Sequence, residues 1–330
     1  MTAMTPLSEI IARLRAAQRI ALATHLDPDA DAIGSTLGLA LALRAWGKQV
    51  AALCDDAVPA ELRFLPEAHL FMDHLPEGFT PDLLIALDSS DTERLGRVAA
   101  PLLAAGLPVI NIDHHATNVH FGTLNLVETA CAATAELVLS VIEALGVALT
   151  PQIATCLMAG VVGDTRSFST AQVTPATLRV AARLVEAGAD LFVITEHVLS
   201  ATSVEALRLL GQALSSLHFE DGVVWTAIPY DAGRPASPDS NPRRGIAGLL
   251  LQAREAAVSA VFTEQADGRV EVSMRARPGY DVAGLALALG GGGHPLAAGC
   301  TLEGPLQEAI RRVVDKLKAQ VAARGSQQNG

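Results

Sequence analysis

The chain has 330 residues, of which half are hydrophobic and 18% are charged. This composition is typical of a globular protein and excludes a disordered or fibrous one, while the length allows two domains with separate cores. The formal net charge is −11. Because affinity for long duplex nucleic acid comes largely from a basic surface, this balance argues against such a partner.

The first part of the chain alternates short apolar segments with helical patterns. Strands are expected at 19–24, 49–54, 83–87 and 108–112, and helices at 35–46 (with Ser35 as N-cap), 92–104, 132–145, 151–163 and 175–187. Short apolar strands that alternate with helices are typical of a parallel sheet covered on both faces. The fold class expected here is therefore α/β, with a mainly parallel sheet flanked by helices.

The second part is expected to form a smaller α/β domain. Residues 191–218 are amphipathic and are predicted to be a helical connector; strands at 223–229, 257–263 and 269–275, a short helix from 281 and a terminal helix from 305 follow. The predicted organisation is thus a first domain at 1–190, the connector at 191–218, a second domain at 219–322, and a disordered tail at 323–330, whose last seven residues, RGSQQNG, include no apolar one.

Several structural classes are excluded by what the chain lacks. The two longest weakly charged stretches, 98–112 and 130–149, are interrupted by prolines or glutamates, so no membrane span is predicted. The N-terminus has no apolar signal-peptide core, which favours a cytoplasmic location. Four scattered cysteines show no paired spacing, which indicates neither a disulfide framework nor a thiolate zinc site.

An acidic motif, HLDPDADAIGS, follows the first predicted strand and contains His25, Asp27, Asp29 and Asp31. Carboxylates this close together repel one another unless a cation neutralises them. Taken alone, such a motif is more typical of a solvated acidic turn that caps a helix than of a metal site.

The same pattern recurs after other elements. Asp88 ends the third predicted strand, Asp113, His114 and His115 end the fourth, and Asp164 follows an apolar helix. Ligands of open α/β sheets bind beyond the carboxyl ends of the strands, so these side chains are expected to meet at one edge. Oxygen and imidazole donors suit Mn²⁺, Mg²⁺ or Co²⁺ better than structural zinc. Their number exceeds what one open catalytic ion needs and indicates a two-metal site for phosphoryl chemistry.

These motifs resemble those of the DHH family of phosphoesterases, which is named after the triplet Asp113-His114-His115. The segment VSMRARPGYDVAGLALALGGGGHPLAAG at 272–299 resembles the DHHA1 domain that accompanies it. Together the two resemblances extend from about residue 19 to 320. The short, two-domain layout is similar to the nanoRNase/pAp-phosphatase branch and not to the longer RecJ exonucleases.

The resemblance implies a role for each matched residue in the first domain. The metal ligands would be His25 and Asp29 for one Mn²⁺ ion, Asp31, His114 and Asp164 for the other, and Asp88 as a bridge between them. The catalytic residues would be Asp88, Asp113, which supports the site from behind the ligands, and His115, which would face the scissile phosphate of the substrate. Asp27 occupies a variable position of the motif and is expected to be a solvated turn residue.

The glycine-rich segment GGGGHPLAAG at 290–299 is a weak signal on its own, because it would also fit a flexible turn. The resemblance implies a substrate-binding loop that includes Gly292, Gly293 and His294. Arg275 and Arg277 would bind the terminal phosphate, using the planar guanidinium fork. Ala276 stands where the family commonly has serine, so one hydroxyl contact is expected to be missing.

The activity implied is hydrolysis of oligonucleotides of about two to five residues to 5′-mononucleotides, and of pAp to AMP. Only two Trp, two Tyr and eight Phe are available for stacking, which favours short RNA or DNA held at its end. A c-di-AMP or pApA phosphodiesterase is the alternative on the same scaffold. A pyrophosphatase or exopolyphosphatase, and a nucleotide sensor that does not cleave, are more distant. A homodimer through the first domain is also implied.

Overall fold

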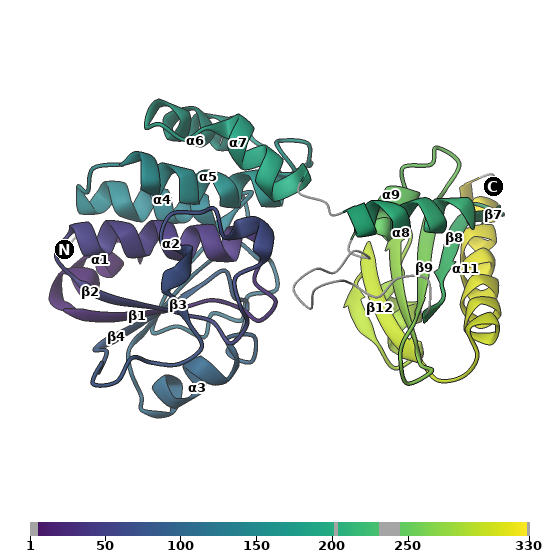
Figure 1. The fold of residues 1–330 in the computed structure, drawn as a ribbon, viewed down its shortest axis with the longest axis horizontal. Coiled ribbons are helices and arrows are strands. Elements are labelled where there is room, and N and C mark those ends of the chain that lie inside the picture. Colours follow the sequence, from purple (N-terminus) through teal and green to yellow (C-terminus); the bar gives the residue numbers. More distant parts are fainter. Residues whose placement is uncertain (1–5, 201–203, 231–244, 329–330) are drawn as a thin grey trace. The chain divides into compact units, whose positions relative to one another are not determined.

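The computed structural model describes residues 6–200, 204–230 and 245–328. The chain divides into two compact units, Met1–Ala201 and Thr202–Gly330, each with one six-stranded sheet and helices (Figure 1). The expected α/β class with a parallel first sheet is confirmed.

The sheet of the first unit has the strand order β3-β2-β1-β4-β5-β6, and every neighbouring pair is parallel. Its strands are β1 (Arg19–Ala23), β2 (Gln49–Leu53), β3 (Phe71–Met72), β4 (Leu83–Leu87), β5 (Val109–Asp113) and β6 (Leu124–Val127). The four strands β1, β2, β4 and β5 were predicted because they are continuous apolar runs, buried on both faces. The edge strands β3 and β6 are short and half-buried and carry no such signal.

Helices cover both faces of this sheet. They are α1 (Pro6–Ala16), α2 (Ala30–Ala45), α3 (Gly96–Ala104), α4 (Thr134–Leu145), α5 (Pro151–Thr165), α6 (Pro175–Glu186) and α7 (Leu191–Thr195). One cluster of buried side chains joins α1, α2, α4 and α5 to one face, and a second cluster joins α3 to the other. The predicted N-cap Ser35 is wrong: Asp29 caps α2, because its side chain accepts hydrogen bonds from the amides of Asp31 and Ala32.

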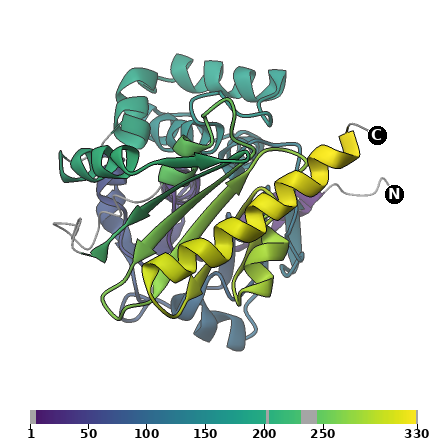
Figure 2. The same ribbon diagram turned by 90° about the vertical axis from the view of Figure 1, so that its right-hand side faces the viewer.

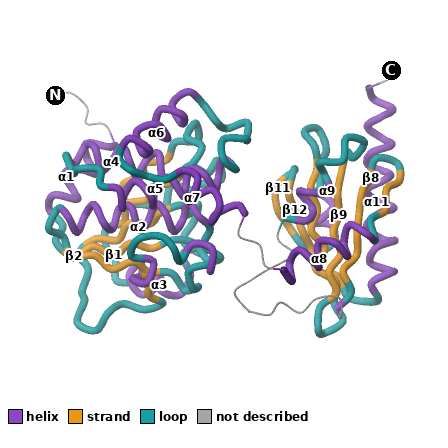
Figure 3. Tube along the Cα trace, turned by 45° about the horizontal axis from the view of Figure 1, so that its top comes forward, coloured by secondary structure: helices purple, strands orange, loops and turns teal. Residues whose placement is uncertain are grey.

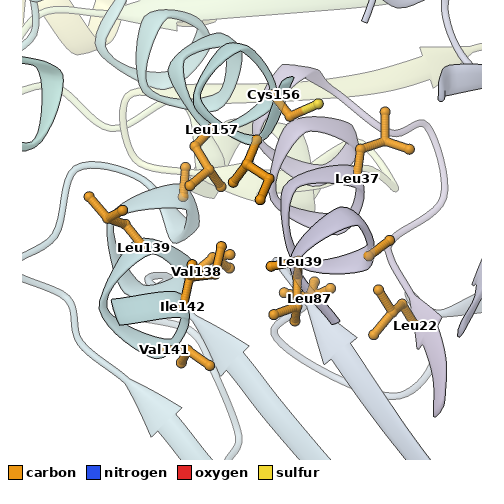
Figure 4. Packing of buried hydrophobic residues seen from close by; sticks show 14 of the residues in the cluster. Leu22, Leu37, Leu39, Leu87, Val138, Leu139, Val141, Ile142, Cys156 and Leu157 are labelled. Carbon is orange, nitrogen blue, oxygen red and sulfur yellow. The ribbon is translucent and has the colours of Figure 1, made fainter. Parts of the chain in front are cut away.

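Helices α2 and α5 lie unusually close together in this core. A Cβ atom built on Gly34 would stand 2.3 Å from the carbonyl oxygen of Cys156, and one on Gly38 would stand 2.7 Å from Leu157. Figure 4 shows buried side chains of the three helices in this core, among them Leu37 of α2, Leu139 of α4 and Leu157 of α5. The close approach places the end of α5, with Asp164, beside the start of α2.

The predicted connector at 191–218 is not a separate segment. Helix α7 and the π-helical turn Glu196–Ser200 pack against α5 in the first unit, whereas α8 (Val204–Ser215) packs against the sheet of the second unit. The boundary between the two units therefore falls at residues 201–202.

The second unit has a mixed sheet of order β11-β12-β10-β9-β8-β7, in which only β8 and β9 are parallel. The strands are β7 (His218–Glu220), β8 (Val223–Ile228), β9 (Val258–Glu264), β10 (Val270–Ala276), β11 (Gly292–His294) and β12 (Ala297–Leu302). Helices α10 (Ala283–Ala288) and α11 (Leu306–Gln328) cover one face, and α8 and α9 (Ile246–Leu250) cover part of the other (Figures 2 and 3). The tail expected to be disordered from 323 continues α11 as far as Gln328.

None of the helices that the structure describes is both long enough and apolar enough to cross a bilayer. None of the four cysteines forms a disulfide; Cys54, Cys156 and Cys300 are buried and Cys131 is half-buried. Burial raises the pKa of the Cys131 thiol to about 12, as expected of an unreactive cysteine.

Candidate metal centre and glycine hairpin

The predicted metal ligands gather at the carboxyl edge of the parallel sheet. His25 follows β1, Asp29 and Asp31 begin α2, Asp88 follows β4, His114 follows β5, and Asp164 lies in the last turn of α5. They form overlapping groups in which the potential ligand atoms lie within 4.8 Å of one another. Asp88 has a positive φ of 56°, a strained conformation typical of functional positions.

The first group consists of His25, Asp29 and Asp88. The Nε2 atom of His25 lies 3.5 Å from Oδ2 of Asp88 and 3.9 Å from Oδ1 of Asp29. The Nδ1 atom of His25 lies 2.7 Å from the carbonyl oxygen of Leu26, which fits an Nδ1–H donor and leaves Nε2 as the donor for a metal.

The second group consists of Asp31, His114 and Asp164. The Nε2 atom of His114 lies 3.1 Å from Asp164, 3.7 Å from Oδ1 of Asp88 and 4.0 Å from Asp31. This nitrogen is buried, yet it makes no hydrogen bond of acceptable geometry to the residues that the structure describes. A buried imidazole nitrogen that faces three carboxylates without a hydrogen bond fits a metal ligand.

The electrostatics of the two groups also fit divalent cations. Burial, together with the charges of Asp88 and Asp164, raises the pKa of Asp31 well above its usual range. Burial likewise raises the pKa of Asp164 to about 6. Burial would raise the pKa of Asp88 as well, but the neighbouring imidazoles of His25, His115 and His114 outweigh it and lower that pKa. A raised pKa means that Asp31 and Asp164 lose their protons less readily than ordinary carboxyl groups. A bound divalent cation would neutralise their charge in place of those protons.

His115 and Asp113 form a pair beside these groups. Oδ1 of Asp113 lies 2.7 Å from Nδ1 of His115, and this hydrogen bond raises the pKa of His115. Asp113 is fully buried and also accepts hydrogen bonds from the backbone amide of His114 and from the side chain of Asn118. His115 is partly exposed and also lies 3.6 Å from Asp88. Asp113 therefore orients a ring whose other nitrogen is left for a ligand.

Asn118 was not singled out from the sequence. Its amide nitrogen lies within hydrogen-bond distance of Asp113, of Asn111 on β5 and of the carbonyl oxygen of Ser89. Its position a few residues after the Asp-His-His triplet is the only signal in the sequence, and that signal does not reveal the contact. Asp27 belongs to none of the metal-binding groups of the described residues and forms an exposed turn with a φ of 53°, as its assignment as a turn residue requires.

The glycine-rich segment is a β-hairpin instead of a loop. Strand β11 pairs with β12. Gly291 and Gly293 lie so close to the backbone of β12 that neither position has room for a side chain. A Cβ on Gly291 would stand 2.1 Å from the carbonyl oxygen of Gly299, and one on Gly293, whose φ is 137°, would stand 2.6 Å from that of Ala297. The hairpin borders a depression of about 510 Å³ whose floor includes Ser273 and Arg275 of β10.

The two predicted phosphate-binding arginines differ in their surroundings. Arg275 lines the depression beside the glycines, and its Nη1 donates to the carbonyl oxygen of the neighbouring Met274. Arg277 instead donates to the carbonyl oxygens of Leu251, Ala253 and Ala256. These contacts hold the turn after α9, which gives Arg277 a structural role that the sequence did not suggest. His294, in β11, is exposed.

Comparison with known proteins identifies the family. Residues 19–161 match the N-terminal domain of the DHH family and residues 236–323 match the DHHA1 domain. The chain is 42% identical over 312 residues to the bifunctional oligoribonuclease and PAP phosphatase of Thermus thermophilus, and the alignment covers 93% of this chain and 91% of that protein. The chain belongs to the DHH family of phosphoesterases. The resemblance stated from the motifs is thereby confirmed.

More distant relatives of this DHH protein share the same layout. The bifunctional oligoribonuclease and PAP phosphatase of Bacillus subtilis is 26% identical, over 89% of this chain and 93% of that one. The cyclic-di-AMP phosphodiesterase of Geobacillus thermodenitrificans is 26% identical over 93% of this chain but only 48% of its own length. Among solved structures, an exopolyphosphatase-related protein from Bacteroides fragilis has the same fold, with a TM-score of 0.87 at 22% identity, covering 97% of this chain and 98% of that one.

Proposed function

We propose that this DHH protein is a two-metal phosphodiesterase and phosphatase that degrades very short oligonucleotides to 5′-mononucleotides and dephosphorylates pAp to AMP. The observation that carries the proposal is the position of Asp88, whose two carboxylate oxygens face different imidazoles: Oδ2 faces His25 and Oδ1 faces His114. A carboxylate placed in this way suits a bridge between two ions. The activity itself is named for the Thermus relative, which is similar to this chain over nearly its whole length.

The ligand groups assign residues to each ion. His25, Asp29 and Asp88 would hold one, and Asp31, His114, Asp164 and Asp88 the other. Oxygen and imidazole donors favour Mn²⁺, with Mg²⁺ or Co²⁺ as substitutes. When bound, such a pair supplies a hydroxide at neutral pH and neutralises charge on the reacting phosphoryl group.

The remaining residues of the first unit would act on the substrate directly. His115 is partly exposed and is held by Asp113 through Nδ1, so its Nε2 atom is available to donate a hydrogen bond to a phosphate oxygen. The buried Asp113 stabilises the protonated ring, which is the form that carries a proton on both nitrogens. Asp113 would therefore contribute by keeping His115 oriented and charged.

Substrate recognition is assigned to the second unit, at the glycine hairpin. Gly292 and Gly293 line the depression with no side chain to cover their backbone, while Arg275 and His294 would donate hydrogen bonds to a phosphate. Arg277 is assigned to this site less directly, since the carbonyl oxygens of its own unit already accept its hydrogen bonds. A cytoplasmic location and a homodimer through the first domain stay predictions.

A substrate panel tests the proposal. Product formation with Mn²⁺ is followed over time on pAp, pApA, c-di-AMP, and single strands of three and 24 nucleotides in RNA and DNA. We expect kcat/KM to be highest for pAp and the trinucleotides and to fall steeply for the longer strands, since the first unit is strongly acidic and aromatic residues for stacking are few. Equal kcat/KM for the two lengths at equal salt would contradict the short-substrate assignment.

The same panel examines the second candidate, a phosphodiesterase acting on c-di-AMP or pApA. Its support is the similarity to the Geobacillus cyclic-di-AMP phosphodiesterase across 93% of this chain. Preferred cleavage of c-di-AMP or pApA over pAp would favour this candidate. No product from any substrate, with metals bound, would leave a nucleotide sensor as the function.

A further inference from the structure

Thr134 occupies a position that the family motifs do not cover. It is the first residue of α4, and its side chain is completely buried next to both metal-binding groups. The N-terminal end of α4 points its free backbone amides toward these groups, as helix N-termini do toward carboxylates.

The side chain of Thr134 contacts the carboxylate assigned as the bridge. Its Oγ1 donates a hydrogen bond of 2.9 Å to Oδ1 of Asp88. Oδ1 of Asp88 also lies 3.7 Å from Nε2 of His114, while Oδ2 of Asp88 lies 3.5 Å from Nε2 of His25. A hydrogen bond to one lone pair of Oδ1 fixes the plane of the carboxylate, so that its two oxygens stay turned toward different imidazoles.

The backbone of Thr134 holds a ligand of the second group. Its amide donates to Oδ2 of Asp31 at 2.5 Å, and the next amide, that of Ala135, donates to Oδ1 of Asp31 at 3.0 Å. Ser35 donates a further hydrogen bond to Asp31 but has none to Asp88. Among the residues that the structure describes, only Thr134 donates hydrogen bonds to both Asp31 and Asp88.

We propose that Thr134 is a positioning residue that sets the orientation of Asp88 and its separation from Asp31, and through them the spacing of the two metal positions. The proposal rests on the two-metal centre of the proposed function. Asp88 needs such support because its backbone is strained, with a φ of 56°, and because no other hydroxyl donates to its carboxylate in the described structure. Partners that orient metal ligands typically change metal affinity or activity by about 10–100-fold when removed.

Three variants of the full chain test this role. Thr134→Val keeps the β-branched shape but removes the hydroxyl, whereas Thr134→Ser keeps the hydroxyl and removes a methyl group. Thr177→Val is the matched control: Thr177 is also fully buried in the first turn of a helix, and its hydroxyl donates to a carboxylate, Glu136, that belongs to no metal-binding group of the described residues. Thermal unfolding without metal establishes that each variant is folded.

The readouts are Mn²⁺ binding by calorimetry and the electron paramagnetic resonance spectrum of the loaded protein, which reports magnetic coupling between two neighbouring Mn²⁺ ions. We expect Thr134→Val to weaken Mn²⁺ binding by about 10–100-fold and to reduce the coupling. Thr134→Ser should restore both, and Thr177→Val should resemble the unaltered protein.

The outcomes separate this inference from the proposed function. If the unaltered protein binds two coupled Mn²⁺ ions and Thr134→Val does the same with equal affinity, the role of Thr134 is wrong and the two-metal centre stands. If Thr177→Val is as impaired as Thr134→Val, or if Thr134→Ser is not restored, the effect is general packing and the role is again wrong. If the unaltered protein does not bind two ions, both proposals fail together. Absence of hydrolysis with intact, Thr134-dependent metal binding overturns the proposed function alone.

Discussion

The two units of this protein place their functional residues by opposite means. In the first unit, an all-parallel sheet brings residues from five places between His25 and Asp164 to one buried edge. In the second, a mostly antiparallel sheet forms an exposed depression from one strand and one hairpin, within residues 271–301. Parallel strands connect through long crossovers, so their carboxyl ends collect distant residues, whereas hairpins collect near ones.

The two units also differ in net charge, in a way that fits the residues each of them gathers. Residues 1–190 have a balance of −10 (11 Lys and Arg against 21 Asp and Glu), and residues 191–330 have a balance of −1 (13 against 14). Buried carboxylates in the first unit need cations, while glycine backbone and arginine in the second suit an anion. If the proposed function is right, metal binding and substrate binding should be separable by mutation, one in each unit.

The largest effect is expected from Asp88→Asn, which keeps the shape of the side chain and removes its charge. Because Asp88 groups with His25 and Asp29 and also with His114 and His115, this change should abolish high-affinity Mn²⁺ binding and lower kcat/KM by about 10³-fold. Calorimetry and a pAp hydrolysis assay measure the two effects. The control, Asp73→Asn, removes an exposed carboxylate of the same unit and should change neither. Full activity of Asp88→Asn would contradict the metal centre.

Arg275→Ala and His294→Ala should weaken substrate binding without affecting metal binding in the other unit. Each should raise KM by about 10–100-fold, the value of a hydrogen bond to a charged group, and leave Mn²⁺ affinity unchanged. Arg269→Ala is the control, since Arg269 is exposed and pairs with Asp267 at a turn. Loss of Mn²⁺ binding in the Arg275 or His294 variant would show that the division of labour between the units is drawn wrongly.

The metal centre should also impose a pH dependence that the second unit lacks. Burial lowers the pKa of His114, but the carboxylates of Asp164, Asp31 and Asp88 outweigh it and raise that pKa to about 10 in the metal-free protein. A metal must displace this proton, so Mn²⁺ affinity should rise with pH between about 6.5 and 10, by up to about tenfold per pH unit for one proton. Calorimetry in buffers of different ionisation enthalpy measures the proton released.

The stability of the metal-free protein should change in the opposite direction. A raised pKa in the folded state means that the proton of His114 stabilises the fold fully below pH 6.5, and that this stabilisation is lost as the pH rises toward 10. The free energy of unfolding without metal should therefore fall over that range. His114→Asn should remove most of this slope, while the exposed His69→Asn should retain it. A slope unaffected by His114→Asn would refute the assignment.

The smallest effect compares helix packing in the two units through one glycine-to-alanine substitution in each. Gly34→Ala places a methyl group 2.3 Å from a carbonyl oxygen of α5 and should destabilise the protein by about 1–3 kcal/mol. Gly211→Ala in α8 meets nothing within 4 Å and should stabilise by about 0.5–1 kcal/mol, because alanine favours helix. Chemical denaturation measures both. Effects of the same sign would mean that α2 and α5 do not pack as closely as described.

Much of this protein was determined by local sequence. The strands β1, β2, β4 and β5 are apolar runs too short for helices, and acidic or histidine residues after β1, β4 and β5 were predicted to be ligands from their position after a strand. The helix expected from residue 175 does begin there, at Pro175, because the side chain of Thr174 accepts a hydrogen bond from the amide of Thr177. These features depend on residues that are close together in the sequence, so they can be predicted without the tertiary structure.

Other features were decided by contacts between distant segments. The half-buried edge strand β6 depends on pairing with β5, and α2 begins at Ala30 because Asp29 caps it, not Ser35, whose hydroxyl donates to Asp31 instead. The hydrogen bonds that Arg277 donates to the turn after α9 also join segments more than 20 residues apart, so the sequence did not reveal them. Thr134 lies 46 residues from Asp88 in sequence, and only the docking of α4 against the sheet edge brings its hydroxyl to that carboxylate. A hydrogen bond has a range of about 3 Å, so its partners are fixed by the packing of whole elements and not by the order of residues.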